Sequence, residues 1–358
     1  MKVLAYPADQ GGCGFYRLIA PCRQLIAQGV DVDYVVDNDP PERQMQALWR
    51  TNDDGSVTVV DVVAPDADVV VLQRPLHAKL AGAIPLLQAQ GVRVVVEIDD
   101  DFEHISRRNV AWPMVQPHLS PARNRANLMR ACELADLVTV STPALAAVYG
   151  RHGRVRVVPN CVPADYLLQR RDEHEGVWVG WSGSTDTHPD DLQVTGNGVA
   201  RAVHATGARV AVVGTGKGVR NALGLREIPL ASGWRTLADY PEALAQFDVG
   251  IVPLELTAFN EAKSALKMME LAAVGVPAVV SPTSENLRMH GEGLGLIARA
   301  PREWEGMVKR LVRDEGYRSE LAWKGREAMQ RWTIEANVER WVDAWSAALS
   351  TRAGTLAR

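Results

Sequence analysis

The sequence contains little cysteine, and its cysteines are not spaced for cross-linking or metal binding. Cys13, Cys22, Cys132 and Cys161 lie far apart, and no C-x-x-C pair is present. Disulfide frameworks and zinc sites both depend on closely spaced or repeated cysteines. The cysteine content therefore predicts neither kind of site, and it is typical of a protein from a reducing compartment.

Long apolar runs are missing as well. No stretch approaches the roughly 18 apolar residues of a membrane-spanning helix. The opening residues, MKVLAYPAD, predict a strand and a turn, and they lack the apolar core of a secretory signal. We therefore expect no transmembrane segment and a cytoplasmic location. Arg123, Arg125 and Arg130 share one predicted helix, which leaves open either peripheral contact with an anionic membrane or plain solvation.

The sequence also lacks an excess of positive charge. It has 39 lysines and arginines against 43 aspartates and glutamates, which gives a net charge of −4. Nucleic-acid-binding proteins usually carry a basic surface, so no nucleic-acid partner is expected. Hydrophobic residues at 47% are ordinary for a globular protein, and 358 residues suffice for two domains.

Short Val-rich runs alternate with longer helical stretches, which is typical of parallel α/β architecture. A polar stretch, Gln169–Gly176, separates two such series and predicts a linker. Helices are expected at Tyr16–Gln28, Ala78–Gln90 and Pro121–Ala135, and again from Trp304 onward. The expected strands are Lys2–Tyr6, Asp31–Val36, Val69–Gln73, Val92–Ile98, Leu137–Ser141, Val155–Pro159, Val177–Trp181, Arg209–Val213, Val249–Val252, Pro277–Ser281 and Gly295–Ala298.

The stretch FNEAKSALKMMELAAVGVPAVVSP, residues 259–282, predicts a helix followed directly by a strand. Lys263, Lys267 and Glu270 are spaced i, i+4 and i+7, so they share one stripe of that helix. Two cations near a helix N-terminus suit a pyrophosphate, and a carboxylate one turn later suits a ribose. The alternative is an amphipathic surface helix whose charged face is solvated.

Small residues follow three predicted strands. Gly11 and Gly12 come after the first strand, and Ser182, Gly183 and Ser184 follow the strand that opens the second half. Such residues let a backbone approach phosphate oxygens closely, although a tight β–α turn needs them too. The third case is the VGTGKG run that contains Gly214. It departs from a dinucleotide fingerprint, because its third glycine is missing and no acid follows about 20 residues later.

Acidic residues and one histidine are the candidate catalytic groups. Asp99 and Asp100 end a strong strand, where ligands bind in open α/β sheets. They are candidates for an acceptor-contacting or base role. A D-x-D metal site made with Asp101 and a helix cap are the alternatives. His188, in the loop of the second half, is a further candidate, with a bystander role as its alternative.

Residues 259–282 resemble the nucleotide-sugar-binding segment of GT-B glycosyltransferases, especially those of family 4. Glu270 matches the carboxylate that holds the donor ribose, and AAVGVPAVV matches the family's AAxGxPVV run. The family's other glutamate falls at Ala262, so that position departs from the pattern. The resemblance implies an N-terminal acceptor domain in 1–168, a donor domain in 176–332, and a last helix in 333–358 that crosses back to the first domain.

The resemblance also implies the chemistry. A sugar would move from a nucleotide-diphosphate sugar to a hydroxyl of a glycan, lipid or protein acceptor, with retention of configuration and without a bound metal or cofactor. Lys263, Lys267 and the backbone of residues 182–184 would stabilise the leaving diphosphate, and Gly11, Gly12 and Gly214 would lie close to the donor. Arg17 is a candidate for a nearby anion. The alternatives are an inactive nucleotide-sugar-binding protein, motivated by Ala262, and an NAD-dependent oxidoreductase built on the Gly214 turn.

Overall fold

The computed structural model describes residues 1–116, 122–215, 218–227 and 229–350. The chain divides into two α/β units, each with its own parallel sheet. Unit 1 comprises Met1–Ile105, Ala111–Asn160 and the C-terminal segment from Asn337, whereas unit 2 comprises Ser106–Val110 and Cys161–Ala336. None of the helices in the described ranges is both long and apolar enough to cross a membrane.

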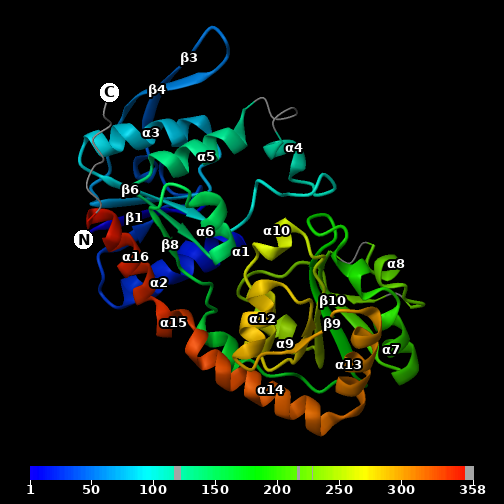
Figure 1. Ribbon diagram of the computed structural model, residues 1–358. Coiled ribbons are helices and arrows are strands. Elements are labelled where there is room, and N and C mark those ends of the chain that lie inside the picture. The colour runs from blue at the N-terminus through cyan, green and yellow to red at the C-terminus, as the bar shows by residue number, and fades with distance from the viewer. Residues whose placement is uncertain (117–121, 216–217, 228, 351–358) are drawn as a thin grey trace. The chain divides into compact units, whose positions relative to one another are not determined.

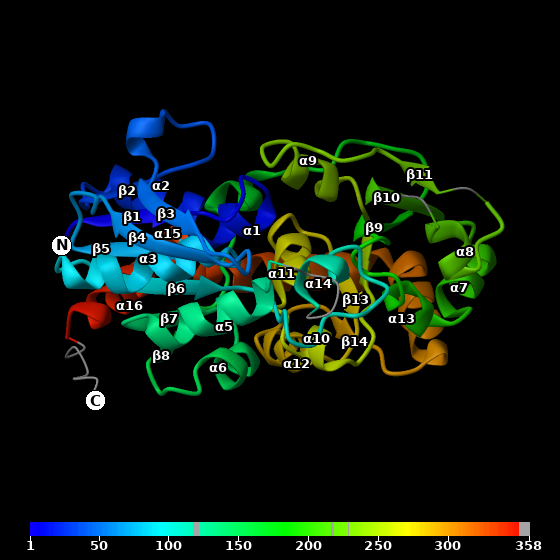
Figure 2. The same ribbon diagram turned by 90° about the horizontal axis from the view of Figure 1, so that it is seen from above.

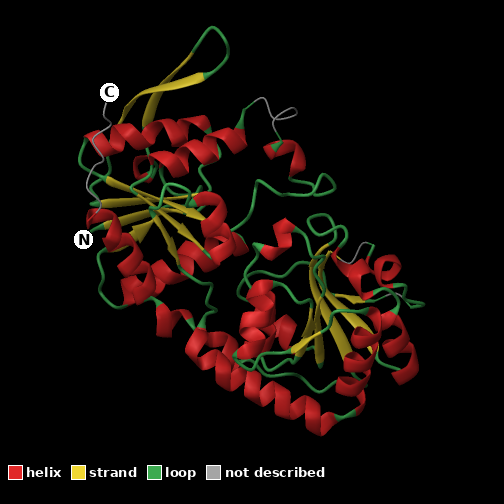
Figure 3. Cartoon of the chain, in the orientation of Figure 1, coloured by secondary structure: helices red, strands yellow, loops and turns green. Residues whose placement is uncertain are grey.

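Unit 1 is built on a six-stranded parallel sheet with the strand order β2-β1-β5-β6-β7-β8. Helices cover both faces of this sheet (Figure 1, Figure 3). Because neither face meets water, β5 is apolar and buried along nearly its whole length rather than alternating. The strands are β1 (Val3–Tyr6), β2 (Val32–Tyr34), β5 (Val69–Gln73), β6 (Arg93–Ile98), β7 (Leu137–Val140) and β8 (Val155–Val157).

The C-terminal helix belongs to unit 1. It packs across β5, β6 and β7, and the indole nitrogen of Trp341 donates to the carbonyl of Arg17 at 2.7 Å. The helices of this unit are α1 (Gly12–Gly14), the π-helical η1 (Phe15–Ile19), α2 (Ala20–Ala27), the 3-10 helix η2 (Pro41–Arg43), α3 (Ala78–Ala89), α4 (Trp112–Val115), α5 (Asn124–Leu134), α6 (Pro143–Tyr149) and α16 (Glu339–Ser350).

One element of unit 1 is absent from the strand pattern predicted from the sequence. An antiparallel hairpin, β3 (Ala47–Thr51) and β4 (Val57–Val62), extends beyond α3 (Figure 1). It leaves Leu48 and Val60 exposed on its surface. Its turn contains Asp54-Gly55, with Gly55 at φ 77°, which is a hairpin signal that the sequence does carry.

Unit 2 repeats the parallel plan with the strand order β11-β10-β9-β12-β13-β14. The longest pairing joins β9 to β10 in register from Trp178↔Arg209 to Ser184↔Thr215. The strands are β9 (Trp178–Ser184), β10 (Arg209–Thr215), β11 (Leu230–Ala231), β12 (Val249–Val252), β13 (Ala278–Val280) and β14 (Leu296–Ile297). The predicted fold class, two parallel α/β sheets, is confirmed.

The helices of unit 2 also cover both faces of its sheet. Helices α7 and α13 lie side by side (Figure 2), while α11 packs on β12 and β13. Trp304 and Val308 of α13 join the strand residues in one core. The helices are η3 (Ala164–Leu168), η4 (Asp191–Thr195), α7 (Gly198–Thr206), α8 (Val219–Leu223), α9 (Tyr240–Ala245), α10 (Ala258–Glu261), α11 (Leu266–Ala273), α12 (Ser284–Gly291), α13 (Pro301–Arg313), α14 (Glu315–Met329), η5 (Gln330–Trp332) and α15 (Ile334–Asn337), the last of which runs to the unit boundary.

The prediction of one continuous helix through residues 259–275 is wrong. The segment forms α10 and α11 with a break between them, and Lys263 lies in that break rather than on a helical stripe. Thr257 caps α10 by accepting from the backbone N–H of Asn260. The Asn260 side chain bonds to Asp191 of another element at 2.7 Å. A tertiary contact therefore holds α10 in place.

Candidate functional site

The carboxyl ends of β9 and β10 bring two glycines face to face. Gly183 and Gly214 are register partners with φ values of 147° and 113°, which side-chain-bearing residues rarely adopt. A Cβ atom on Gly214 would lie 2.3 Å from the carbonyl oxygen of Gly183. Both positions therefore require glycine, and the two strand ends pack closely against each other. Gly216 and Lys217, which complete the glycine-rich run, lie outside the described residues.

Lys267 lies in the first turn of α11, above these strand ends. A Cβ atom on Gly183 would be 3.6 Å from the Lys267 ammonium. Burial lowers the pKa of Lys267, and the neighbouring charge of Lys263 lowers it further, whereas Glu270 and Asp191 raise it. The structure thus places Lys267 beside Gly183, with Lys263 close enough for its charge to act on Lys267. A bound anion would offset the cost of holding two ammonium groups close together.

Glu270, one turn after Lys267, is only 3% exposed. The hydroxyl of Tyr240 on α9 lies 3.3 Å from its carboxylate and 3.1 Å from the Oγ of Ser182 on β9. Burial and the Glu270 carboxylate raise the pKa of Tyr240, so its hydroxyl keeps its proton and can donate. Tyr240 therefore links Glu270, which is predicted to bind the ribose, to Ser182 of the predicted phosphate-binding loop. Tyr240 was not among the predicted site residues.

His188 and Asp191 form a hydrogen-bonded pair beside this site. Nδ1 of His188 lies 2.7 Å from Oδ2 of Asp191. Burial lowers the pKa of His188, and Lys263 and Lys267 act in the same direction, although Asp191 opposes them. Neutral His188 then donates from Nδ1 and leaves Nε2 as an acceptor.

Asp191 is held from two further directions. Its Oδ1 accepts from Asn260 Nδ2 at 2.7 Å and from the backbone N–H of Glu255 at 2.9 Å. Asp191 and Asn260 were not singled out from the sequence. The only signal available was the i, i+3 spacing of His188 and Asp191, which is compatible with a loop or a helix end.

A short segment that precedes α4 packs against the loop that carries His188. Ser106–Val110 belongs to unit 2, and its Asn109 side chain donates to the Thr187 carbonyl at 2.8 Å. The backbone N–H of Val110 donates to the carbonyl of Asp186 at 3.2 Å, and Arg108 pairs with Asp190. These bonds fix the loop that carries His188.

The predicted acidic residues of unit 1 lie at the carboxyl end of β6. Arg74 donates to both carboxylate oxygens of Asp99, at 2.5 and 2.8 Å, and lies 3.9 Å from Asp100. The backbone of Arg74 is left-handed, with φ 48°, which is uncommon for a residue other than glycine. The catalytic roles of Asp99 and Asp100 stay predictions. Within the described part of the chain, no group of three or more Asp, Glu, His or Cys residues is placed to hold a metal.

The turn after β1 is held by hydrogen bonds within the turn. The backbone N–H groups of Gly11 and Gly14 both donate to Oδ1 of Asp9, at 2.8 and 3.1 Å. A Cβ atom on Gly14 would lie 1.8 Å from the Asp9 carbonyl oxygen, so this position also requires glycine. The donor contacts expected of Gly11 and Gly12 stay predictions.

The expectation that Arg17 serves a nearby anion is wrong. Its side chain is 1% exposed, and its guanidinium donates to Glu97 at 2.8 Å and to Asn160 at 2.7 Å. The same group donates to the Val158 carbonyl and faces the ring of Trp341. Arg17 therefore ties the sheet of unit 1 to its C-terminal helix.

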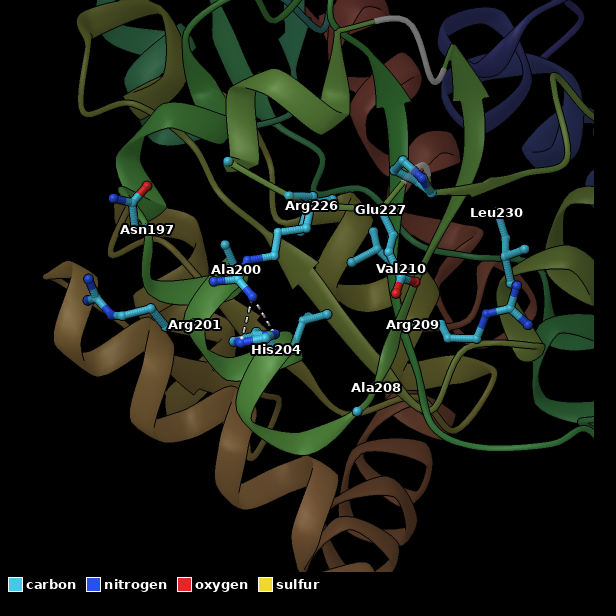
Figure 4. A pocket seen from close by; sticks show the side chains of 15 residues that line it. Asn197, Ala200, Arg201, His204, Ala208, Arg209, Val210, Arg226, Glu227 and Leu230 are labelled. Atoms are coloured by element: carbon cyan, nitrogen blue, oxygen red, sulfur yellow. Dashed lines mark hydrogen bonds between the residues drawn. The ribbon is translucent and has the colours of Figure 1, made fainter.

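A cavity of about 550 Å³ lies elsewhere in unit 2 (Figure 4). Arg209 and Val210, at the start of β10, and residues of α7 line it, and Arg226 donates to Nε2 of His204 at 2.9 Å. Gly214 lies at the other end of β10. The cavity is therefore separate from the predicted site and contains none of the predicted site residues.

Comparisons with known proteins bear on the identity of the chain. Residues 198–343 match the model of a family described as glycosyl transferase-like. No curated protein matches the chain by sequence.

Several solved structures share the fold across nearly the whole chain. A sucrose-phosphate synthase from Thermosynechococcus elongatus is 16% identical with a TM-score of 0.64, over 98% of this chain and 100% of that one. HepE from Anabaena, in complex with UDP and glucose, is 13% identical with a TM-score of 0.63, over 97% and 100%. WaaG, a glycosyltransferase involved in lipopolysaccharide biosynthesis, is 13% identical with a TM-score of 0.62, over 99% and 100%.

At such identities the likeness to solved structures establishes the fold, and the family model adds the class of the second unit. The match from residue 198 to residue 343 covers α11, with Lys267 and Glu270. The prediction is thereby confirmed as far as these matches reach: residues 198–343 form a glycosyl transferase-like domain, and the chain has the GT-B fold.

Proposed function

We propose that the protein transfers a sugar from a nucleoside-diphosphate sugar to an acceptor hydroxyl, with unit 2 holding the donor. The observation that carries this proposal is the placement of Lys267 and Glu270 on α11, above the glycine strand ends of β9 and β10. The ammonium suits a diphosphate, and the carboxylate one turn further along suits the ribose hydroxyls.

The main catalytic contribution of these residues is to stabilise the departing diphosphate. Lys267 and Lys263 oppose its negative charge, and the N-terminal N–H groups of α11 add a partial positive charge. Anion binding would reverse the lowering of the Lys267 pKa, because an opposite charge favours the ammonium form. Tyr240 would hold the Glu270 carboxylate in position to accept from the ribose.

Related proteins suggest where a search for substrates should begin. The HepE structure contains UDP and glucose, so uridine nucleotide sugars are the first donors to test. WaaG takes part in lipopolysaccharide biosynthesis, which makes glycan and lipid-linked acceptors the first choice. A protein acceptor, retention of configuration, an acceptor-binding role for unit 1 and the cytoplasmic location stay predictions.

Thermal unfolding with a panel of nucleotide sugars and UDP tests the proposal. A true donor raises the midpoint by mass action. Lys267→Ala and Glu270→Ala should each weaken the affinity about 10- to 100-fold, since a hydrogen bond to a charged group contributes about 1.5–3 kcal/mol. Lys324→Ala and Glu320→Ala, an exposed ion pair on α14, are the matched controls and should bind normally.

Normal binding in both site variants would show that the donor lies elsewhere.

A second candidate function, an inactive nucleotide-sugar-binding protein, is favoured by one observation. Ala262 is 2% exposed at the position where the family carries a glutamate, so an apolar, buried group replaces a carboxylate. Stabilisation by a nucleotide sugar without hydrolysis or transfer would support that function.

A further inference from the structure

The cavity of about 550 Å³ in unit 2 is bounded by α7, the start of β10 and the loop that follows α8. Asn197, Ala200 and His204 line it at i, i+3 and i+7, so they share one side of α7. Gly224 ends α8 in a left-handed conformation, with φ 70°, and a Cβ atom there would lie 3.0 Å from Oδ1 of Asn197. This close approach directs the loop after α8 along the same cavity.

A hydrogen bond joins the loop to α7 on the cavity wall. Arg226 extends from the loop toward α7, and its Nη1 lies 2.9 Å from Nε2 of His204 (Figure 4). A guanidinium can only donate, so Nε2 accepts and the neutral ring carries its hydrogen on Nδ1. Nδ1 is 3.4 Å from the same Nη1, which places an imidazole N–H next to the arginine fork. The bond orients the fork before any ligand arrives and so lowers the entropy that binding would cost.

The lining carries more positive than negative charge. In the described part of the chain, its arginines and acidic residues are Arg201, Arg209, Arg226 and Glu227. Arg201 points toward α13 (Figure 4), where Glu305 accepts from its Nε at 2.5 Å. Neither Arg209 nor Arg226 forms an ion pair with a carboxylate of the described residues. Two guanidiniums are thus available to an anion, against one lining carboxylate.

Most of the other lining residues are apolar. Ala208 and Val210 are buried at the start of β10, and Ala200, Leu225 and Leu230 are partly exposed around them. Small-molecule sites combine such apolar walls with a few polar groups, in volumes of about 300–1,000 Å³. The cavity has this composition and size, and its polar groups are cationic.

We propose that this cavity is a second ligand site that binds an organic phosphate, with the phosphate on Arg226 and His204 and the carbon body against Val210. A phosphate offers three acceptor oxygens and more than one negative charge, which suits an arginine fork beside a further N–H group. Gly214 of the predicted donor site lies toward the other end of β10, so both sites can be occupied at once. The inference does not depend on the proposed sugar transfer.

Phenyl phosphate is the probe, because it joins a phosphate to an apolar ring. It should raise the thermal unfolding midpoint of the wild-type chain by mass action. The rise should persist in excess UDP, which would occupy the proposed donor site. Titration calorimetry should show inorganic phosphate binding about 10-fold more weakly, since it has no ring to bury.

Three variants locate the bound phosphate. Arg226→Gln keeps a donor for His204 but removes the charge, and should weaken the affinity for phenyl phosphate about 10- to 100-fold. Ala200→Phe fills the cavity from α7 and should abolish binding, while its midpoint without ligand reports whether it folds. Arg220→Gln replaces an exposed arginine of α8 that does not line the cavity, so this matched control should bind normally.

Wild-type affinity for phenyl phosphate in both Arg226→Gln and Ala200→Phe would place the phosphate elsewhere and overturn the inference. Displacement of phenyl phosphate by UDP, or no response of the wild-type chain to phenyl phosphate, would overturn it as well. A failure of every nucleotide sugar to bind would contradict the proposed function alone.

Discussion

The two His–Asp pairs of this molecule share a geometry and differ in their surroundings. Each joins Nδ1 to Oδ2 at 2.7 Å across an i, i+3 spacing, one after β6 in unit 1 and one after β9 in unit 2. The side chain of His104 is 51% exposed, whereas that of His188 is 18% exposed. The same hydrogen bond therefore holds one imidazole in contact with water and the other in a buried network.

The difference teaches that the neighbours, rather than the pair itself, set the role. His188 sits close to Lys263 and Lys267, which together with burial lower its pKa and keep it neutral beside a cationic site. Asp191 fastens three elements at once, whereas Asp101 orients a single ring. The His188 pair is thus part of a network beside the two lysines, whereas the His104 pair faces solvent.

The largest expected effect is a difference in the free energy of unfolding between variants of Asp191 and Asp101. Asp191→Ala removes the acceptor for His188, Asn260 and the Glu255 N–H, and should lower the free energy of unfolding by about 3 kcal/mol. Asp101→Ala removes an acceptor for two groups, one of them half exposed, and should cost about half as much. Urea unfolding followed by tryptophan fluorescence measures both, and equal losses would contradict the comparison.

A smaller effect concerns the pH dependence of stability. Because the pKa of folded His188 is lowered, the unfolded chain binds more protons as the pH falls below about 6.5. The stabilisation from neutral His188 is therefore complete above that pH and is lost as the pH falls toward the folded pKa.

His188→Gln should flatten this decline in urea midpoints measured between pH 5 and pH 8. His152→Gln is the comparison variant, since burial and then Arg154 also lower the pKa of that histidine. It is less buried and should change the slope less. An unchanged slope in His188→Gln would show that its imidazole is solvated.

The smallest expected effect concerns the segment Ser106–Val110. Arg108 is 62% exposed, and surface ion pairs such as Arg108–Asp190 contribute at most about 1 kcal/mol. Arg108→Ala should change stability by no more than about 0.5 kcal/mol, whereas Asn109→Ala, which loses a bond to a loop carbonyl, should cost about 1 kcal/mol. Thermal unfolding of the two variants tests that order. A larger loss in Arg108→Ala would make the ion pair the main anchor of the segment.

Much of the fold could be predicted because buried parallel strands have a strong local pattern. The runs at Val69–Gln73 and Val92–Ile98 coincide with β5 and β6 almost to the residue. The hairpin β3–β4 was missed because its strands are largely exposed and show no continuous apolar run. The break between α10 and α11 was also missed, and the bond that holds α10 in place joins Asn260 to Asp191, which is far away in the sequence.

The candidate site was predictable only where one element carries the chemistry. Lys267 and Glu270 lie on a single helix, so their spacing in the sequence reveals that they act together. Tyr240 reaches Ser182 across 58 residues, and Asn260 reaches Asp191 across 69 residues, and no local pattern encodes such contacts. Arg17 was misassigned for the same reason, since its partner Glu97 is 80 residues away.

The place of α16 in unit 1 has a consequence for the order of assembly. The sheet of unit 1 is made first, yet the helix that packs on β5, β6 and β7 follows the whole of unit 2 in the chain. At roughly 5–20 residues per second, translation of the residues between them takes on the order of 10 seconds or more. We expect unit 2 to fold on the ribosome while the apolar face of unit 1 is still open, which makes the nascent chain a client for chaperones.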